Sequence, residues 1–192
     1  MNCRTLAITI ASLLAFALTA CSKQDSAHVK AVAPEQIFET VVNQGKGFTA
    51  GSIDSTTVVY AIFDPSCGHC ADLWRASREL NNIRFVWIPV AIMRPSGKST
   101  RQGAALLASP SAATLMDEHE ASILAGTGGL TIDTGTSESK AAIQVNTSMF
   151  EGLGIEGVPF IVAKSPKTGQ VVTHAGTMTT GALATLLGVD AL

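Results

Sequence analysis

The sequence predicts an α/β fold, with one open sheet covered by helices and a helical insertion at about 96–153. Two observations lead to this class. Apolar runs at 56–63 and 83–92 are separated by a stretch of helical periodicity, which is typical of a strand, helix, strand unit. After the insertion, the chain closes with two short strand patterns at 159–164 and 170–174 and a helix pattern at 180–187.

The first of these strands carries the main features of the prediction. Residues 56–63 form a β-rich apolar run that ends in Asp64-Pro65-Ser66, so we expect a buried central strand followed by a turn. Downstream, Leu73, Trp74 and Leu80 recur at helical spacing. In the second strand, Pro89 indicates an edge, a bulge or an early end.

Three helices are predicted in the insertion, at 100–109, 111–124 and 137–153. A further helix opens at Pro34, because a proline suits the first helical turn and apolar residues follow on one face until Gly45. The predicted domain therefore covers 34–192, and the polar stretch 22–33 before it is expected to be a flexible tether.

Composition and charge limit the classes of function. The chain has 192 residues, of which 46% are hydrophobic and 15% charged, and its net charge is -2. Such a chain can bury one sizeable core. Since there is no basic stripe, we predict no nucleic-acid partner.

The N-terminal residues predict export. A short basic start precedes an apolar run from Thr5 to Ala20, so residues 1–20 are interpreted as a signal peptide. A membrane-spanning helix is the alternative, although the run is shorter than the roughly 18 residues that spanning requires. Leu18-Thr19-Ala20-Cys21 resembles a bacterial lipobox, which implies lipidation of Cys21. An ordinary cysteine beyond a cleavage site remains the other interpretation.

By resemblance to enterobacterial lipoproteins, Ser22 after the cysteine favours the outer membrane. The expected location is thus the periplasm, with a lipid anchor to a bacterial membrane.

The chemistry is predicted at Cys67-Gly68-His69-Cys70, at the start of the helix that follows the first strand. Cysteines three residues apart on a first helical turn are close enough to form a disulfide bond. We expect Cys67 to attack, because the helix N-terminus stabilises its thiolate, and Cys70 to resolve from a more shielded position. Gly68 and His69 are expected to tune the thiolate.

Half of a zinc site is the main alternative for this motif, but the mature chain has no second cysteine pair and its histidines are scattered. We interpret His119 as a solvated helix residue and His174 as a strand-face residue. The sequence predicts no metal site and no cofactor.

Val158-Pro159 precedes the closing strand and is the candidate second half of the site. A proline at a strand entry can be cis and expose the preceding backbone to a substrate chain, although a plain turn proline fits the sequence equally well.

With these motifs in place, the chain resembles the thioredoxin superfamily, and within it the catalytic domain of periplasmic disulfide isomerases of the DsbC/DsbG type. The features shared with the DsbG type are Asp64-Pro65-Ser66, Arg94-Pro95 and the alanine-rich stretch 103–109. The resemblance implies a thioredoxin fold, with Cys67 as nucleophile, Cys70 as resolving thiol and Pro159 as the cis-proline. No acid occupies Ala61, where thioredoxins keep a buried carboxylate, which agrees with the isomerase branch.

Three features differ from that branch. One is Gly68-His69, which resembles the dipeptide of eukaryotic disulfide isomerases. The stretch 22–48 is too short for the usual dimerisation domain, so we expect a monomer. Val158 stands in place of the usual threonine. The leading hypothesis is a thiol:disulfide oxidoreductase that acts on cysteines of exported proteins and exchanges electrons with a membrane redox partner. The alternative is a lipid-anchored chaperone or metal-binding module without catalysis.

Overall fold

A five-stranded sheet forms the centre of the protein in the computed structural model, which describes residues 32–93 and 97–190. The strand order is β1-β3-β2-β4-β5. The strands are β1 Phe48–Gly51, β2 Val58–Phe63, β3 Arg84–Pro89, β4 Phe160–Lys164 and β5 Val171–Ala175. The predicted signal peptide, Cys21, most of the tether and Arg94-Pro95 lie outside the described residues.

Strand β2 is central, as predicted. It pairs in parallel with β3 and antiparallel with β4. Val59, Ala61 and Phe63 belong to one apolar cluster, whereas Ile62 belongs to the cluster on the opposite face. Because both faces are covered, the strand is apolar at nearly every position.

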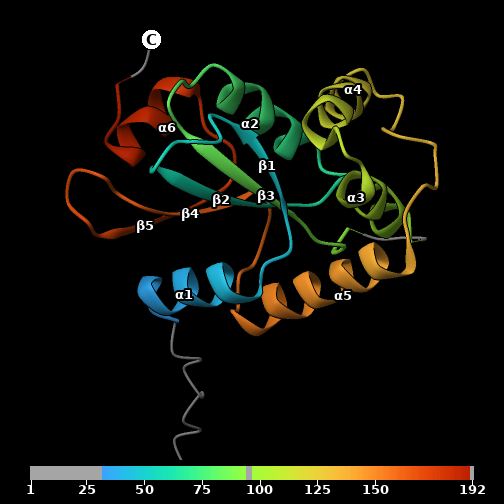
Figure 1. Ribbon diagram of the computed structural model, residues 1–192, viewed down its shortest axis with the longest axis horizontal. Helices are drawn as coiled ribbons and strands as arrows, with labels where there is room; N and C mark the ends of the chain where they lie inside the picture. The colour runs from blue at the N-terminus through green and yellow to red at the C-terminus, as the bar shows by residue number, and fades with distance from the viewer. Residues whose placement is uncertain (1–31, 94–96, 191–192) are drawn as a thin grey trace, which may run out of the picture. The chain divides into compact units, whose positions relative to one another are not determined.

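Helices cover both faces of the sheet (Figure 1). Helices α2 and α6 lie on one face, and α1 and α5 lie on the other; α3 packs against α4 and α5. Their bounds are α1 Pro34–Gln44, α2 Gly68–Arg78, α3 Lys98–Ala108, α4 Ala112–Leu124, α5 Ser137–Gly152 and α6 Thr180–Leu187. None of the helices within the described ranges is long and apolar enough to cross a membrane.

The predicted α/β fold with a helical insertion is confirmed, with one strand that the sequence did not supply, and the structure decides among the predicted alternatives for Pro89. Strand β1 was not predicted, because four residues are too few to show an alternation. Pro89 ends β3 early, although β3 lies between β1 and β2 and is not an edge strand. The missing N–H of a proline is tolerated there because it is the last residue of the strand.

Candidate redox site

The two cysteines lie at the start of α2, where β2 has just ended. Cys67 is the N-cap residue, with extended backbone, and its carbonyl oxygen accepts the N–H groups of Cys70 and Ala71 at 3.1 and 3.3 Å. Both thiols are free in the structure. The helix therefore begins at the cysteine pair, and its unsatisfied N–H groups point toward Cys67.

The pKa of Cys67 is lowered to about 6. A hydrogen bond from the Cys70 thiol is the largest cause, and the backbone N–H groups of Cys70 and His69 and the charge of His69 add to it, while burial opposes them. A thiol with this pKa is about 90% thiolate at pH 7. Cys67 is thus a nucleophile at neutral pH.

Cys70 has the opposite environment. Its side chain is 0% exposed, against 5% for Cys67. Burial raises the pKa of Cys70 far above its ordinary value, and the hydrogen bond to Cys67 and the charge of that thiolate raise it further. Cys70 therefore keeps its proton while Cys67 is a thiolate.

The Val158–Pro159 peptide bond is cis, and it faces the cysteines. The Sγ atom of Cys67 lies 3.8 Å from the carbonyl oxygen of Val158. The side chain of Val158 is partly buried and contacts the apolar clusters on both faces of the sheet. The structure thereby brings together Cys67, Cys70, Val158 and Pro159, while Gly68 and His69 are exposed beside them.

Asp64 holds the loop that leads to Cys67, a role that the sequence analysis did not assign. Its carboxylate is 0% exposed and accepts four hydrogen bonds. The donors are the N–H groups of Ser66, Ile92 and Met93, at 2.8, 2.8 and 2.9 Å, and the hydroxyl of Ser99, at 2.6 Å. A charged acceptor with four donors fixes the position of this loop.

Gln102 of α3 ties the helical insertion to the same loop. Its amide nitrogen donates to the carbonyl oxygens of Gly128 and Leu130, both at 2.9 Å, and its amide oxygen accepts the Ser66 hydroxyl at 3.4 Å. The insertion is therefore built into the redox site through hydrogen bonds.

The interpretation of His119 as a solvated helix residue is wrong. Its side chain is 0% exposed, because α4 turns this residue toward the loop before Cys67. Nδ1 accepts the N–H of Leu130 at 3.1 Å, so Nε2 carries the proton and donates to the carbonyl oxygen of Pro65 at 2.7 Å. Burial lowers the pKa of His119 and keeps it neutral. His174 lies in β5 and is partly exposed.

Glu120 is a buried acid near the cysteines that the sequence analysis also missed. It lies in α4, whereas Ala61 lies in β2. Glu120 is 1% exposed, and neither carboxyl oxygen has a hydrogen-bond partner. Burial, and next the charge of Cys67, raise the pKa of Glu120 to about 9. A helix that is only partly amphipathic gives no sign of which polar residue faces inward.

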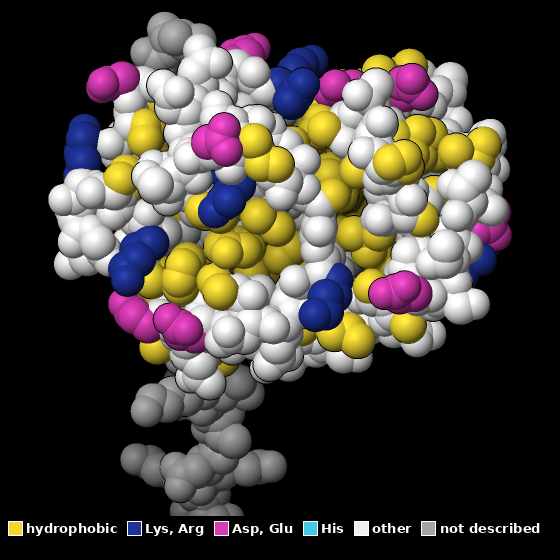
Figure 2. All heavy atoms as spheres, viewed as in Figure 1, with side chains coloured by type: hydrophobic (Ala, Val, Ile, Leu, Met, Phe, Trp, Pro, Cys, Tyr) yellow, Lys and Arg dark blue, Asp and Glu magenta, His cyan; other side chains and the backbone are white. Residues whose placement is uncertain are grey.

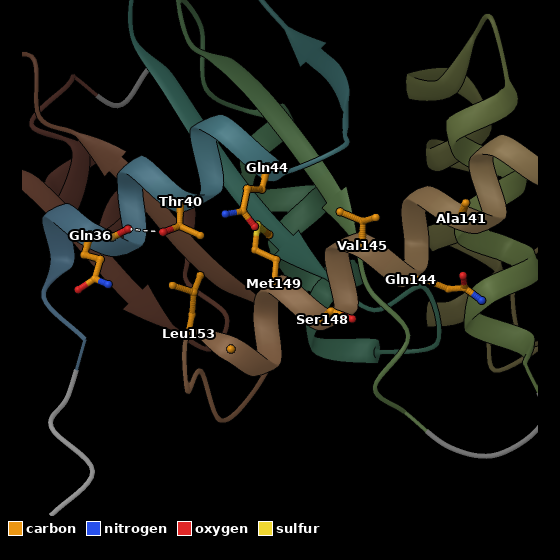
Figure 3. A pocket seen from close by; sticks show the side chains of 10 residues that line it. Gln36, Thr40, Gln44, Ala141, Gln144, Val145, Ser148, Met149 and Leu153 are labelled. Atoms are coloured by element: carbon orange, nitrogen blue, oxygen red, sulfur yellow. Dashed lines mark hydrogen bonds between the residues drawn. The ribbon is translucent and has the colours of Figure 1, made fainter.

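On the face shown in Figure 2, basic and acidic side chains are interspersed. A hollow of about 620 Å³ lies between α1 and α5. Figure 3 shows Thr40 and Gln44 of α1 on one side of it, and Met149 of α5 and Leu153, which follows α5, on the other. None of the side chains that line it titrates, so it adds nothing to the redox chemistry.

Within the described residues, no group of three or more His, Cys, Asp or Glu side chains could hold a metal ion.

Comparison with solved structures identifies the fold. The catalytic domain of Proteus mirabilis ScsC superimposes with a TM-score of 0.56 at 15% identity, covering 80% of this chain and 94% of that one. The fold is that of thioredoxin-like proteins. The thiol-disulfide exchange protein alpha-DsbA2 from Wolbachia pipientis gives a TM-score of 0.60 at 14% identity, covering 81% and 94%.

A thioredoxin-like oxidoreductase from Silicibacter pomeroyi gives a TM-score of 0.59 at 18% identity, covering 78% of this chain and 95% of that one. The thioredoxin fold predicted from the cysteine motif and its setting is thus confirmed. No model of a known protein family and no curated protein sequence matches the chain.

Proposed function

We propose that the protein is a thiol:disulfide oxidoreductase that acts on cysteines of exported proteins. The observation that carries this proposal is the contrast between two thiols in one helical turn. Cys67 has a pKa lowered to about 6, whereas Cys70 is fully buried and its pKa is raised. Disulfide exchange needs one thiolate that attacks the client disulfide and a second thiol that stays protonated until it resolves the mixed disulfide.

The steps follow from these two environments. The Cys67 thiolate attacks a client disulfide, which forms a mixed disulfide and releases one client thiolate. Cys70 then loses its proton and attacks the Sγ atom of Cys67, which releases the second client thiolate and leaves a Cys67–Cys70 disulfide. The same steps in reverse transfer the disulfide to a client dithiol. The carbonyl group of Val158, next to Cys67, is the expected hydrogen-bond acceptor for a client backbone.

The names of the structural neighbours support this chemistry. They include a thiol-disulfide exchange protein from Wolbachia pipientis and a disulfide interchange protein from Neisseria gonorrhoeae. A periplasmic thioredoxin-like protein from Salmonella enterica is a further neighbour. We place this protein in the periplasm as well, held by a lipid on Cys21 at the outer membrane, as a monomer served by a membrane redox partner.

Trapping of mixed disulfides tests the proposal. In a Cys70→Ala variant the resolving thiol is absent, so mixed disulfides between Cys67 and clients should accumulate and be visible on non-reducing gels. A Cys67→Ser variant and the double variant are the matched controls and should trap nothing. Folded Cys70→Ala protein that forms no mixed disulfide with an unfolded, disulfide-containing client would overturn the proposal.

The direction of exchange is decided by the redox potential of the Cys67/Cys70 pair. A thiolate stabilised to a pKa of about 6 stabilises the reduced form, so we propose that the protein works as an oxidant or isomerase. The expected potential in glutathione buffers is about -120 to -180 mV, and a value near -270 mV would instead identify a reductant.

A further inference from the structure

Strand β5 lies at one edge of the sheet, so β4 is its single neighbour among the strands that the structure describes (Figure 1). Two backbone hydrogen bonds of 2.8 Å bound this pairing. The N–H of Ser165 donates to the carbonyl oxygen of Gln170, and the N–H of Gly176 donates to that of Pro159. Hydrogen-bonded pairs recur at every second residue of an antiparallel ladder. The even-numbered residues of β5 therefore bond to β4.

The odd-numbered residues of β5 point their backbone groups the other way. Val171, Thr173 and Ala175 each offer one N–H and one carbonyl oxygen at the outer edge. None of these six groups has a hydrogen-bond partner in the described part of the chain. A row of donors and acceptors at the spacing of a strand is a template for a further strand.

The sequence of β5 contains nothing that blocks such pairing. Residues 171–175 include no proline, lysine or acidic residue, and three of the five are β-branched. The opposite edge of the sheet is different. Strand β1 has four residues, ends at Gly51 with a φ of +85°, and lies beside α4. Of the two edges, β5 is the one that can accept a strand.

The open edge begins next to the redox site. Ala175 is followed by Gly176, whose N–H bonds to Pro159. The carbonyl oxygen of Val158 lies 3.8 Å from the Sγ atom of Cys67. A strand added to β5 would lie two strand spacings from β4, or about 10 Å, which an extended chain covers in about three residues. A client bonded to Cys67 can thus reach the edge with residues near its own cysteine.

We propose that β5 is the docking strand for the client chain: an extended client segment, beginning about three residues from the client cysteine, pairs with the open edge as a sixth strand. This inference rests on the proposed function and adds how the client is held. Backbone hydrogen bonds supply affinity without a fixed sequence, which suits a protein that acts on unfolded chains.

The two faces of β5 set a preference among client segments. Val172 packs with the cluster on the α2 face, and Val171 packs with the cluster on the α1 face. Side chains of the added strand lie next to these residues on alternate faces, where β-branched and aromatic residues make favourable cross-strand contacts. Segments rich in such residues should be preferred, and a proline within them should prevent pairing.

Backbone-methylated peptides test this inference on the Cys70→Ala protein. The probe carries one cysteine as a mixed disulfide with 2-thiopyridine and, from the third residue after it, the segment Val-Thr-Val-Thr-Val. The Cys67 thiolate attacks the peptide sulfur, which forms a new disulfide and breaks the bond to the pyridine sulfur. The released thiolate takes a proton from water and becomes pyridine-2-thione, whose absorbance gives the rate constant.

Methylation of every second amide in this segment removes the donors on one edge of the client strand alone. One of the two alternating sets faces β5, so methylation of that set should slow the reaction by about tenfold. Methylation of the other set should leave the rate within about twofold of the unmethylated peptide. Because β5 is unaltered in this comparison, it decides the inference even if a variant of β5 does not fold.

Two proline variants test the same contact from the side of the protein. Thr173→Pro removes an N–H from the outer edge without removing a bond to β4, and should slow the unmethylated peptide by about fivefold. Thr49→Pro is the matched control on β1. The bond from the N–H of Ser52 to Ile83 sets the alternation there, so the N–H of Thr49 also faces outward. Its rate should equal that of the protein without the proline.

Equal rates for the two methylated peptides would overturn the inference, as would equal rates for folded Thr173→Pro and Thr49→Pro. A dimer in sedimentation experiments that Thr173→Pro abolishes would also overturn it, because a second copy of the chain would then occupy the edge. A Cys67 thiolate that reacts neither with the peptide nor with the thiopyridyl disulfide of glutathione would instead overturn the proposed function.

Discussion

The two faces of the sheet differ in what they bury. The face that carries α2 includes both cysteines, and the buried titratable residues Asp64, His119 and Glu120 are grouped around them. The cluster under α1 and α5 consists of apolar side chains such as Ile62 and Phe150. A buried polar side chain that α5 adds on this side, Asn146, is an uncharged amide that bonds with the backbone of Lys46 and Pro89. Polar groups in a low-dielectric interior have strong effects on nearby thiols, whereas an apolar cluster contributes packing alone. One face therefore sets the chemistry, and the other contributes stability.

The largest effect is expected from Asp64→Ala. Three backbone N–H groups and one hydroxyl lose their acceptor, and a donor left unsatisfied in the interior costs about 1–3 kcal/mol. Because water can reach the donors that are not fully buried, such as the N–H of Met93, the free energy of unfolding should fall by about 3 kcal/mol or more. The pKa of Cys67, measured by thiolate absorbance, should also change because the loop moves. Asp64→Asn retains an acceptor oxygen, so its decrease in the free energy of unfolding and its change in the pKa of Cys67 should both be smaller. Equal losses in the two variants would argue against the hydrogen-bond account.

Ile62→Ala tests the opposite face. Its side chain is fully buried, so truncation should lower the free energy of unfolding by about 2–5 kcal/mol. The pH profile of alkylation at Cys67 should nevertheless keep its midpoint near pH 6, because no polar group near the thiols is touched. A shift of that midpoint as large as in Asp64→Ala would break the contrast between the two faces.

His119 should make the stability depend on pH. Burial lowers its pKa in the folded state, so the unfolded chain binds more protons, and stability falls as pH drops below about 6.5. The expected loss is about 1–2 kcal/mol between pH 7 and pH 5, from denaturant unfolding. His119→Gln should remove this dependence, whereas His174→Gln, in partly exposed β5, should retain it. A pH dependence that persists in His119→Gln would assign it to another group.

The smallest effect is expected from His69→Ala. His69 is exposed, and its charge is the last of the causes that lower the pKa of Cys67, whereas its backbone N–H is unaffected by the substitution. The alkylation midpoint of Cys67 should rise slightly, and the rate near pH 6 should fall by less than about tenfold. Because the side chain is in solvent, the difference should shrink in about 1 M salt. A difference that salt leaves unchanged would indicate a contact other than charge.

Most of the secondary structure could be predicted because apolar periodicity is a local property. The predicted helix at 180–187 matches α6, and the predicted strands at 159–164 and 170–174 match β4 and β5 within one or two residues. The four residues of β1 were not found, because that strand is defined by its pairing with β3. The sequence left the geometry of Pro159 open, and the structure has a cis bond there that faces Cys67.

By itself, the sequence determined the α/β class and the cysteine pair at a helix start, because both are local patterns of contiguous residues. The export signal stays a prediction. Tertiary structure alone decided which polar residues surround the thiols. Asp64 meets the loop at 92–93, His119 meets Pro65, and Glu120 meets the α2 face below Cys67. These residues are distant in sequence from their partners or carry no local pattern. The burial of His119 and Glu120 exists only once α4 has packed against α2, and the hydrogen bonds of Asp64 form only once the loop at 92–93 and Ser99 of α3 have reached it.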